Sequence, residues 1–289
     1  MATVRDLRDR IRSLKNTQQI TKAMKQVAAA KIRRAEAARK RARPYADALA
    51  EMLSDLIAAV SSVDHPFMKP GKAGAPAGIV LVSADKGLAG AFNSNVIGAA
   101  ERFARAQDGV RYYTVGVKAR NAVRRAGMAD HPTWPLSGGS KIQTAREVAI
   151  RASDDFRSGA ISEIVLVSQK LVSMMSQRPQ TRKLVPILES SFDSAQGDKQ
   201  KSKGAVEFAP SPEFVLSRLL PKYLEFTIYS AMLETDAAFF AAQLVAMTNA
   251  TDNASKLIDE LTIAMNNARQ AAITKELLEI VAGAEALGV

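Results

Sequence analysis

The sequence predicts an α/β protein: a long antiparallel coiled coil of the N- and C-terminal helices with an inserted, Rossmann-like doubly wound α/β domain. Two observations support this prediction. Residues 1–43 and 222–282 contain neither glycine nor proline, and the middle of the chain alternates short apolar strands with helical runs. The predicted boundaries are 1–62 for the N-terminal helix, 75–208 for the α/β domain and 209–289 for the C-terminal helix.

The N-terminal helix is predicted from a stripe of apolar residues at helical spacing. The stripe comprises Val4, Leu7, Ile11 and Leu14, and is expected to continue through Ile20, Met24 and Val27. Pro44 removes one backbone donor and could kink the helix, but the apolar pattern resumes after it. A helix of this length would extend about 80–90 Å, so it must project or pair with another helix.

The middle of the chain is predicted to form a parallel, doubly wound sheet. Residues 78–82, 110–115 and 163–167 have the composition of buried strands, and helical runs separate them. Residues 170–188 are expected to be extended, and residues 190–204 are polar and are expected to form a loop. This alternation of strands and helices is the pattern of a sheet with helices on both faces.

The C-terminal helix is predicted to pair with the N-terminal one. A repeat with 4-3-4-3-4-3 spacing indicates a coiled-coil seam, and its alanines would let the helices approach closely. The expected seam comprises Leu257, Leu261, Ala264, Ala268, Ala271, Lys275 and Leu278. Residues 248–254 carry Asn, Asp and Thr that a helix interior rarely favours, so either an outside contact or weak packing is expected there.

Charge is distributed unevenly along the chain. The formal net charge is +11, and residues 1–43 hold 14 Lys or Arg against 3 Asp or Glu. Residues 222–289 hold 4 basic and 9 acidic residues. The two terminal helices can therefore attract each other, and the basic surplus points to an acidic partner outside the chain.

The residue types that are missing limit the possible chemistry. Cysteine is absent, which excludes disulfides, a cysteine nucleophile and thiolate metal ligands. The two histidines, His65 and His131, stand far apart and outside any HExxH-like pattern, so neither a histidine-based zinc site nor a Ser-His-Asp triad is expected, and only a histidine acting alone stays open. The chain shows no apolar stretch long enough for a membrane span, and its start lacks the apolar segment of a signal peptide.

Two other classes of function stay open on composition alone. Residues 83–90 follow a predicted strand and precede a helical run, as phosphate-binding loops do, which would suit a Rossmann-type nucleotide-binding enzyme. They contain neither GxxxxGK[ST] nor GxGxxG, so a plain turn is favoured. The basic helix would suit a coiled-coil nucleic-acid protein, but the first 44 residues contain no aromatic side chain.

Three motifs, in order along the full chain, resemble those of the gamma subunit of F-type ATP synthases. Residues 11–24 read I-R-S-L-K-N-T-Q-Q-I-T-K-A-M, residues 83–93 read S-A-D-K-G-L-A-G-A-F-N, and residues 268–284 read A-R-Q-A-A-I-T-K-E-L-L-E-I-V-A-G-A. The resemblance implies a coiled-coil rotor shaft inside a ring of three alpha and three beta subunits. It also implies an α/β foot that rests, with the epsilon subunit, on the membrane ring of c subunits.

The resemblance further implies a non-catalytic subunit that uses no cofactor and no metal and binds no nucleic acid. Such a shaft transmits torque between the proton-driven c ring and the three catalytic sites. Organelle members carry transit peptides and this chain does not, so a bacterial form is expected. It would be peripheral, on the cytoplasmic side of the inner membrane, and held there indirectly through the c ring.

The resemblance also assigns partner contacts to individual residues. Those expected to touch beta or alpha are Met24, Lys25, Lys31, Arg33, Arg34, Lys86, Arg269, Gln270, Thr274 and Glu276. Glu207 and Phe208 are expected to contact epsilon and the c ring. Many bacterial members have an arginine where this chain has Gln243, so one charged contact with beta is not expected here.

Overall fold

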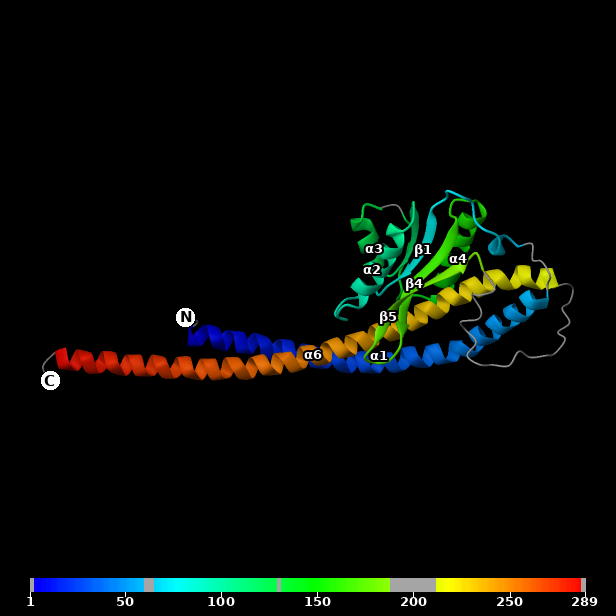
Figure 1. Cartoon of the computed structure of the whole chain (residues 1–289). Coiled ribbons are helices and arrows are strands. Elements are labelled where there is room, and N and C mark those ends of the chain that lie inside the picture. The colour runs from blue at the N-terminus through cyan, green and yellow to red at the C-terminus, as the bar shows by residue number, and fades with distance from the viewer. Residues whose placement is uncertain (1–2, 60–64, 129–130, 188–211, 287–289) are drawn as a thin grey trace. The chain divides into compact units, whose positions relative to one another are not determined.

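The structure, a computed structural model, consists of long helices and an α/β domain built on one β-sheet (Figure 1). It describes residues 3–59, 65–128, 131–187 and 212–286. The chain divides into two compact units. The paired-helix unit contains Met1–Ala28 and Leu244–Val289, and the α/β unit contains Ala29–Gln243. Helices α1 (Val4–Ala59) and α6 (Pro212–Ala286) each contribute to both units.

A five-stranded sheet of order β3-β2-β1-β4-β5 forms the centre of the α/β unit. Its strands are β1 (Ala77–Val82), β2 (Val110–Val115), β3 (Thr133–Trp134), β4 (Glu163–Leu171) and β5 (Gln177–Val185). The first four strands pair in parallel, and β5 pairs antiparallel with β4. The predicted fold class is thereby confirmed, and the extended stretch after residue 170 becomes β5 and the turn before it.

Helices cover both faces of this sheet, which explains why every residue of β1 is buried. Helices α2 (Phe92–Arg105) and α3 (Val117–Arg125) pack on the face that contains Ile79 and Leu81. Val80 and Val82 point to the other face, where α4 (Lys141–Arg157) joins α1 and α6 in the largest core cluster. A short 3-10 helix, η1 (Pro66–Met68), adds the buried Phe67 to that cluster.

Both long helices continue through a proline. Pro44 lies inside α1 and Pro221 inside α6. Because α6 begins at Pro212, the helix starts well before the stretch without glycine and proline that predicted it. A proline in a long helix is tolerated when tertiary packing offsets the free-energy cost of the lost hydrogen bond. Leu220, beside Pro221, is fully buried and provides such packing.

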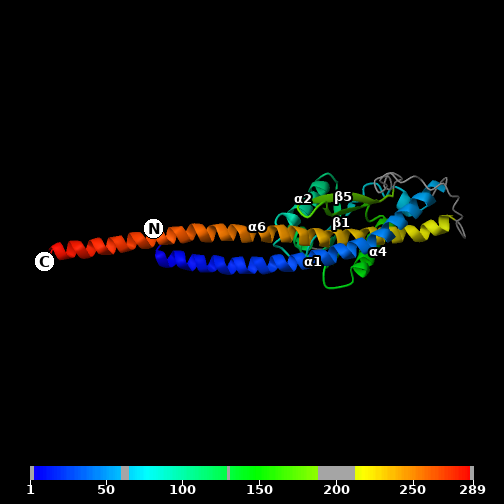
Figure 2. The same cartoon turned by 90° about the horizontal axis from the view of Figure 1, so that it is seen from below.

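In the paired-helix unit, α1 and α6 run antiparallel and side by side, as both views show (Figures 1 and 2). Leu7 and Ile11 are buried, so the first part of the predicted α1 stripe is confirmed. In its continuation Met24 is half-buried, but the prediction is wrong for Ile20, which is 60% exposed, and for Val27, which is 53% exposed. Thr21 and Ala28 are buried instead, because they keep the 3-4 spacing that Ile20 and Val27 break.

The seam of α6 has the predicted spacing in a different register. Its buried or half-buried positions are Met247, Thr251, Ala254, Ile258, Leu261, Met265 and Ala268. Two residues of the predicted seam, Leu261 and Ala268, lie in the observed one. The other predicted seam residues are exposed, Leu257 to 46%: Leu257, Ala264, Ala271, Lys275 and Leu278. The hydroxyls of Thr251 and Thr21 lie 2.8 Å apart across the seam. This hydrogen bond accounts for part of the polar run at 248–254, because a threonine here joins the two helices.

Candidate partner-binding surfaces

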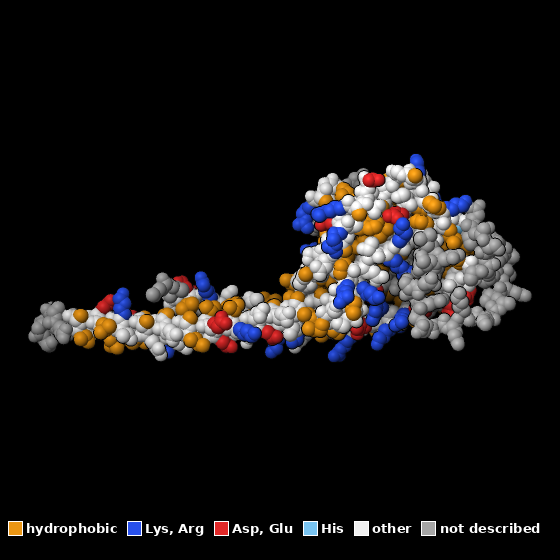
Figure 3. All heavy atoms as spheres, in the orientation of Figure 1, with side chains coloured by type: hydrophobic (Ala, Val, Ile, Leu, Met, Phe, Trp, Pro, Cys, Tyr) orange, Lys and Arg blue, Asp and Glu red, His pale blue; other side chains and the backbone are white. Residues whose placement is uncertain are grey.

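The last turns of α6 present a fully exposed helix surface. Every residue from 269 to 282 is exposed. In both views this end of α6 extends past the start of α1 (Figures 1 and 2). Figure 3 shows hydrophobic side chains, in orange, along this end of the molecule. The large apolar side chains of the segment are each between 49% and 68% exposed: Ile273, Leu277, Leu278, Ile280 and Val281. Apolar groups in such number on one segment indicate a surface for a partner.

The same segment carries the polar side chains that the sequence singled out. The hydroxyl of Thr274 donates to the carbonyl oxygen of Gln270 at 3.0 Å, which leaves its oxygen free to accept. The side chains of Arg269, Gln270 and Glu276 form no hydrogen bond or ion pair with the described residues. The surface therefore combines apolar area with unused donors and acceptors, the composition of a binding interface.

The N-terminal segment of α1 contributes a second group of predicted contacts. Met24 and Lys25 are half-buried within the paired-helix unit. The exposed side chains of Ile20 and Val27 belong to the same unit. Sequence reasoning assigned these two apolar side chains to the seam and so missed that they are available to a partner. Their departure from the 3-4 spacing was the signal that could have revealed this.

Three basic residues of α1 in the α/β unit are predicted contacts, namely Lys31, Arg33 and Arg34, and their surroundings differ. Lys31 places its ammonium 5.4 Å from the centre of the Phe240 ring of α6, so it helps to hold the two helices together. Arg33 and Arg34 are exposed and form no ion pair with the described residues. They are therefore the cations of this group that an acidic partner can neutralise.

The loop at 83–93 forms hydrogen bonds with the chain's own backbone and does not form a phosphate-binding site. We call this hydrogen-bonded loop the clasp. The Asp85 carboxylate accepts backbone N–H groups from Val117 at 3.0 Å, from Leu136 at 3.2 Å and from Ser137 at 2.8 Å. Asn93 accepts from the N–H of Ala84 and donates to the carbonyl of Lys86. A carboxylate thus occupies the N-terminus of α3, where a bound phosphate would need unused N–H groups.

The space beyond the end of β1 is also filled. Ala84, Ala89 and Phe92 are buried against residues 237–242 of α6, and the Phe92 and Phe239 rings lie 5.6 Å apart. This is where a Rossmann-type protein opens a crevice for its nucleotide. The packing of α6 there argues against the nucleotide-binding enzyme considered from the sequence.

The backbone at Gly116 lies in close contact with the start of the clasp at Ser83. Its φ is +100°, and a Cβ added there would lie 2.2 Å from the carbonyl oxygen of Ser83. The Ser83 hydroxyl accepts the N–H of Ala119 at 2.7 Å, which joins β1 to α3. Lys86 and Leu88 remain exposed at the tip of the loop, and Leu88 has a φ of +61°. The clasp therefore holds Lys86, a predicted contact, at the surface.

The remaining predicted residues have different outcomes. Gln243 is only 9% exposed, so its side chain is buried within the chain. Glu207 and Phe208 lie outside the described residues, as does the predicted loop at 190–204. The described residues contain no group of three or more His, Cys, Asp or Glu side chains arranged to hold a metal ion. No helix in the described part of the chain combines the length and apolarity that a membrane crossing needs.

The paired helices, their exposed apolar end and the attached α/β unit define the class: a coiled-coil subunit of a larger assembly. The ATP synthase family model matches residues 3–287. An ATP synthase gamma chain of Heliobacterium modesticaldum is 42% identical over 292 residues, which cover 100% of both chains. That of Phenylobacterium zucineum is 41% identical and covers 99% of this chain and 100% of its own. The chain belongs to the ATP synthase gamma-chain family.

Solved structures agree on the fold. A chain of the Euglena gracilis mitochondrial ATP synthase superposes with a TM-score of 0.68 at 19% identity, covering 98% of this chain and 94% of that one. A chain of the Tetrahymena thermophila mitochondrial ATP synthase gives a TM-score of 0.59 at 20% identity, covering 80% of this chain and 99% of that one. The long helices and the α/β sheet are thus shared across distant sequences.

Proposed function

We propose that this chain is the central-stalk rotor subunit of an F-type ATP synthase. Its helices would turn inside a ring of three alpha and three beta subunits, and its α/β unit would rest with epsilon on the c ring. The exposed end of α6, residues 269–282, is the observation that carries the proposal most directly. Full-length similarity to curated gamma chains supports it.

The rotor acts by differential contact. Three identical catalytic sites around one asymmetric shaft meet a different surface at each shaft angle, so each site is biased toward a different nucleotide affinity. This is a coupling free energy between shaft angle and site occupancy, and it is reciprocal. Proton flow that turns the shaft would drive ATP release, and ATP hydrolysis would turn the shaft in the opposite direction.

Individual contacts follow from the free side chains. Arg269, Gln270, Thr274 and Glu276 would meet beta in only some orientations, because they extend from one exposed helix end. Charge-assisted hydrogen bonds of this kind contribute about 1.5–3 kcal/mol each, enough to make one shaft angle preferred over another. Arg33, Arg34 and the exposed Lys86 would meet acidic groups of the surrounding subunits, and Met24 and Lys25 would face an acidic segment of beta.

The foot and the location of the chain complete the proposal. The boundaries 1–62, 75–208 and 209–289 would separate two shaft helices from the foot domain. Glu207 and Phe208 would contact epsilon and the c ring. The subunit would be non-catalytic, and peripheral on the cytoplasmic side of a bacterial inner membrane, with its membrane association indirect and through the c ring.

Co-expression with the alpha and beta subunits of the same organism tests this function. We expect the chain to elute in an assembly of about 350–400 kDa, as three alpha, three beta and one gamma subunit require. A matched chain that ends at residue 268 should lose coupling between ATP hydrolysis and rotation. If the full chain elutes alone while alpha and beta assemble without it, the proposed function is wrong.

A further inference from the structure

His65 caps the short helix η1 through its imidazole ring. The Nδ1 atom accepts the backbone N–H of Phe67 at 3.1 Å, and the His65 side chain is only 8% exposed. A backbone N–H can only donate, so Nδ1 carries a lone pair and the single ring proton lies on Nε2. This hydrogen bond, which we call the His65 cap, therefore exists only while the imidazole is neutral.

The residue held by the His65 cap belongs to the core of the α/β unit. Phe67 is fully buried in the largest core cluster, and its ring lies 6.1 Å from the ring of Phe156 in α4. The carbonyl oxygen of Phe67 also accepts the N–H of Ile187 at 2.7 Å. The His65 cap thus lies where the segment between α1 and β1 is joined to the chain just after β5.

The surroundings of His65 disfavour its protonated form. The guanidinium carbon of Arg157 in α4 lies 5.0 Å from the centre of the Phe67 ring, and that ring packs edge-on against the imidazole. Burial and, as a smaller cause, the positive charge of Arg157 lower the pKa of His65. The folded α/β unit therefore keeps this histidine neutral at pH 7.

Among the described residues, the other elements around the His65 cap offer the imidazole no ion pair. In α4, the Asp155 carboxylate accepts the Tyr113 hydroxyl at 2.6 Å and already pairs with two arginines. Helix α1 adds apolar side chains to the core cluster, and Lys69, directly after η1, is itself a cation. Asp64 precedes His65 and lies outside the described residues.

We propose that His65 is an acid-sensitive switch in the connection between α1 and β1. Protonation turns Nδ1 into a donor that faces the N–H of Phe67, so the hydrogen bond is lost and a cation is left in a buried position near Arg157. The imidazolium then moves toward water, and η1 loosens from the core with it. This response belongs to the α/β unit and does not depend on the assembly that the chain joins.

The direction of the response follows from the two protonation equilibria. In the unfolded chain His65 has the ordinary histidine pKa of about 6.5, and in the folded chain its pKa is lower. Between these two values the unfolded state binds more protons than the folded state. The contribution of the His65 cap to stability is therefore complete above about pH 6.5 and is lost as the pH falls from there through the folded value.

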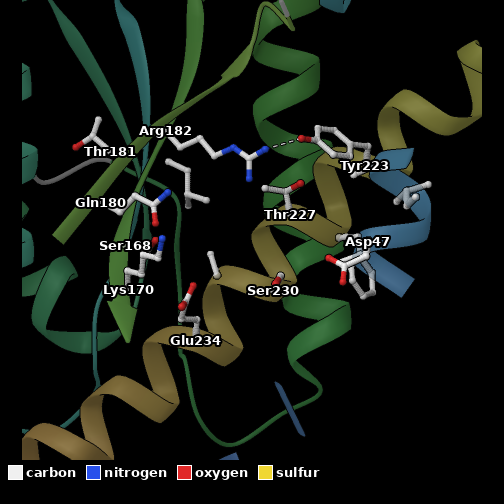
Figure 4. Close-up of a pocket in the computed structure, with 16 residues that line it drawn as sticks. Asp47, Ser168, Lys170, Gln180, Thr181, Arg182, Tyr223, Thr227, Ser230 and Glu234 are labelled. Carbon is white, nitrogen blue, oxygen red and sulfur yellow. Dashed lines mark hydrogen bonds between the residues drawn. The ribbon is translucent and has the colours of Figure 1, made fainter. Parts of the chain in front are cut away.

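Glu234 also has a pKa that is shifted toward neutral pH, and it lies elsewhere. Burial raises the pKa of Glu234, opposed by the charges of Arg39 and Lys170. Glu234 lines a pocket formed by α1, β4, β5 and α6, together with Lys170 and Ser230 (Figure 4). No residue of η1 lines this pocket. A pH response measured at η1 is therefore separable from one at Glu234.

Amide hydrogen exchange at Phe67 and Ile187, followed by NMR on the full chain at pH 7.5 and pH 5.5, tests the proposal. We expect the protection factors of both amides to fall about fivefold at the lower pH, as loss of one helix cap implies. His65→Asn keeps an N-cap acceptor without a titrating group, so its protection factors should be equal at both pH values. His131→Asn is the matched control, because it removes the other histidine of the chain and should keep the wild-type fall. Glu234→Gln should keep that fall as well.

Titration of the His65 ring signals by NMR gives a second measurement, with a midpoint expected below pH 6.5. A midpoint at or above pH 6.5, or equal protection factors at both pH values in the wild type, would overturn the proposal. A fall in His65→Asn as large as in the wild type would overturn it too. These wild-type measurements decide the question even if His65→Asn does not fold. They use the chain alone, whereas the rotor function is tested in the assembly, so failure of one leaves the other standing.

Discussion

Replacing Asp85 with alanine should destabilise the α/β unit, because this half-buried carboxylate is an internal acceptor and not one of the predicted partner contacts. The carboxylate accepts three backbone N–H groups, and the substitution removes all three bonds. The N–H of the exposed Ser137 can bond to water instead, whereas Leu136 is buried and Val117 is half-buried. Two donors left unsatisfied cost about 1–3 kcal/mol each, so we expect a loss of about 3 kcal/mol.

Thermal unfolding followed by far-UV circular dichroism measures this loss. For a unit of this size, about 3 kcal/mol corresponds to a fall of about 6–12 °C in the midpoint. Asp108→Ala is the control, because Asp108 is an exposed carboxylate that forms no ion pair or side-chain hydrogen bond with the described residues. Equal midpoints for Asp85→Ala and the control would refute the interpretation of the loop as a structural clasp.

Three further predictions concern the surface and the seam. The double variant Gln270→Leu, Thr274→Val should assemble normally but show ATP turnover lower by about tenfold or more, measured at matched complex yield. Wild-type turnover would show that this side of α6 is only a solvent-exposed surface. Lys86→Ala should keep the wild-type thermal midpoint, because within the chain only the backbone carbonyl of Lys86 accepts a hydrogen bond. ATP turnover in the assembly should fall, and unchanged turnover would remove Lys86 from the interface. Thr21→Val and Thr251→Val should each cost about 1 kcal/mol in urea unfolding, and the double variant should cost about as much as either one, because each single change already removes the bond across the seam while the remaining hydroxyl still bonds a carbonyl of its own helix; additive losses would contradict a paired hydrogen bond.

The sequence predicts the architecture well because its strongest signals extend over many residues. These signals are the two long stretches without glycine or proline and the alternation of strands and helices between them. A stretch of 61 residues without glycine or proline, with apolar residues at helical spacing, strongly favours a helix, and the apolar strand at β1 is buried on both faces. The two-residue β3 was not predicted, because so short a strand is defined by pairing with β2 rather than by its own composition. The direction of β5 likewise depends on its pairing with β4.

The seam register was mispredicted for a physical reason. Apolar residues were assumed to face inward, but Ile20 and Leu257 are exposed while Thr21 and Thr251 meet across the helices. A subunit made for a surrounding partner carries apolar groups on its outer face, so composition alone does not distinguish seam from interface.

The role of Asp85 was also invisible in the sequence. Its three partners lie 32, 51 and 52 residues away along the chain, and only the folded sheet brings them together. By contrast, Arg269, Gln270 and Thr274 could be singled out because their motif is local and the structure leaves them exposed.

Direct observation of rotation tests the central claim. The assembly of alpha, beta and this chain would be fixed to a surface through beta, and a bead attached to an exposed residue of the α/β unit would report motion. We predict unidirectional turning in steps of one third of a turn when ATP is added, with the direction set by hydrolysis. An assembly that hydrolyses ATP at full rate while the bead stays still would contradict the account.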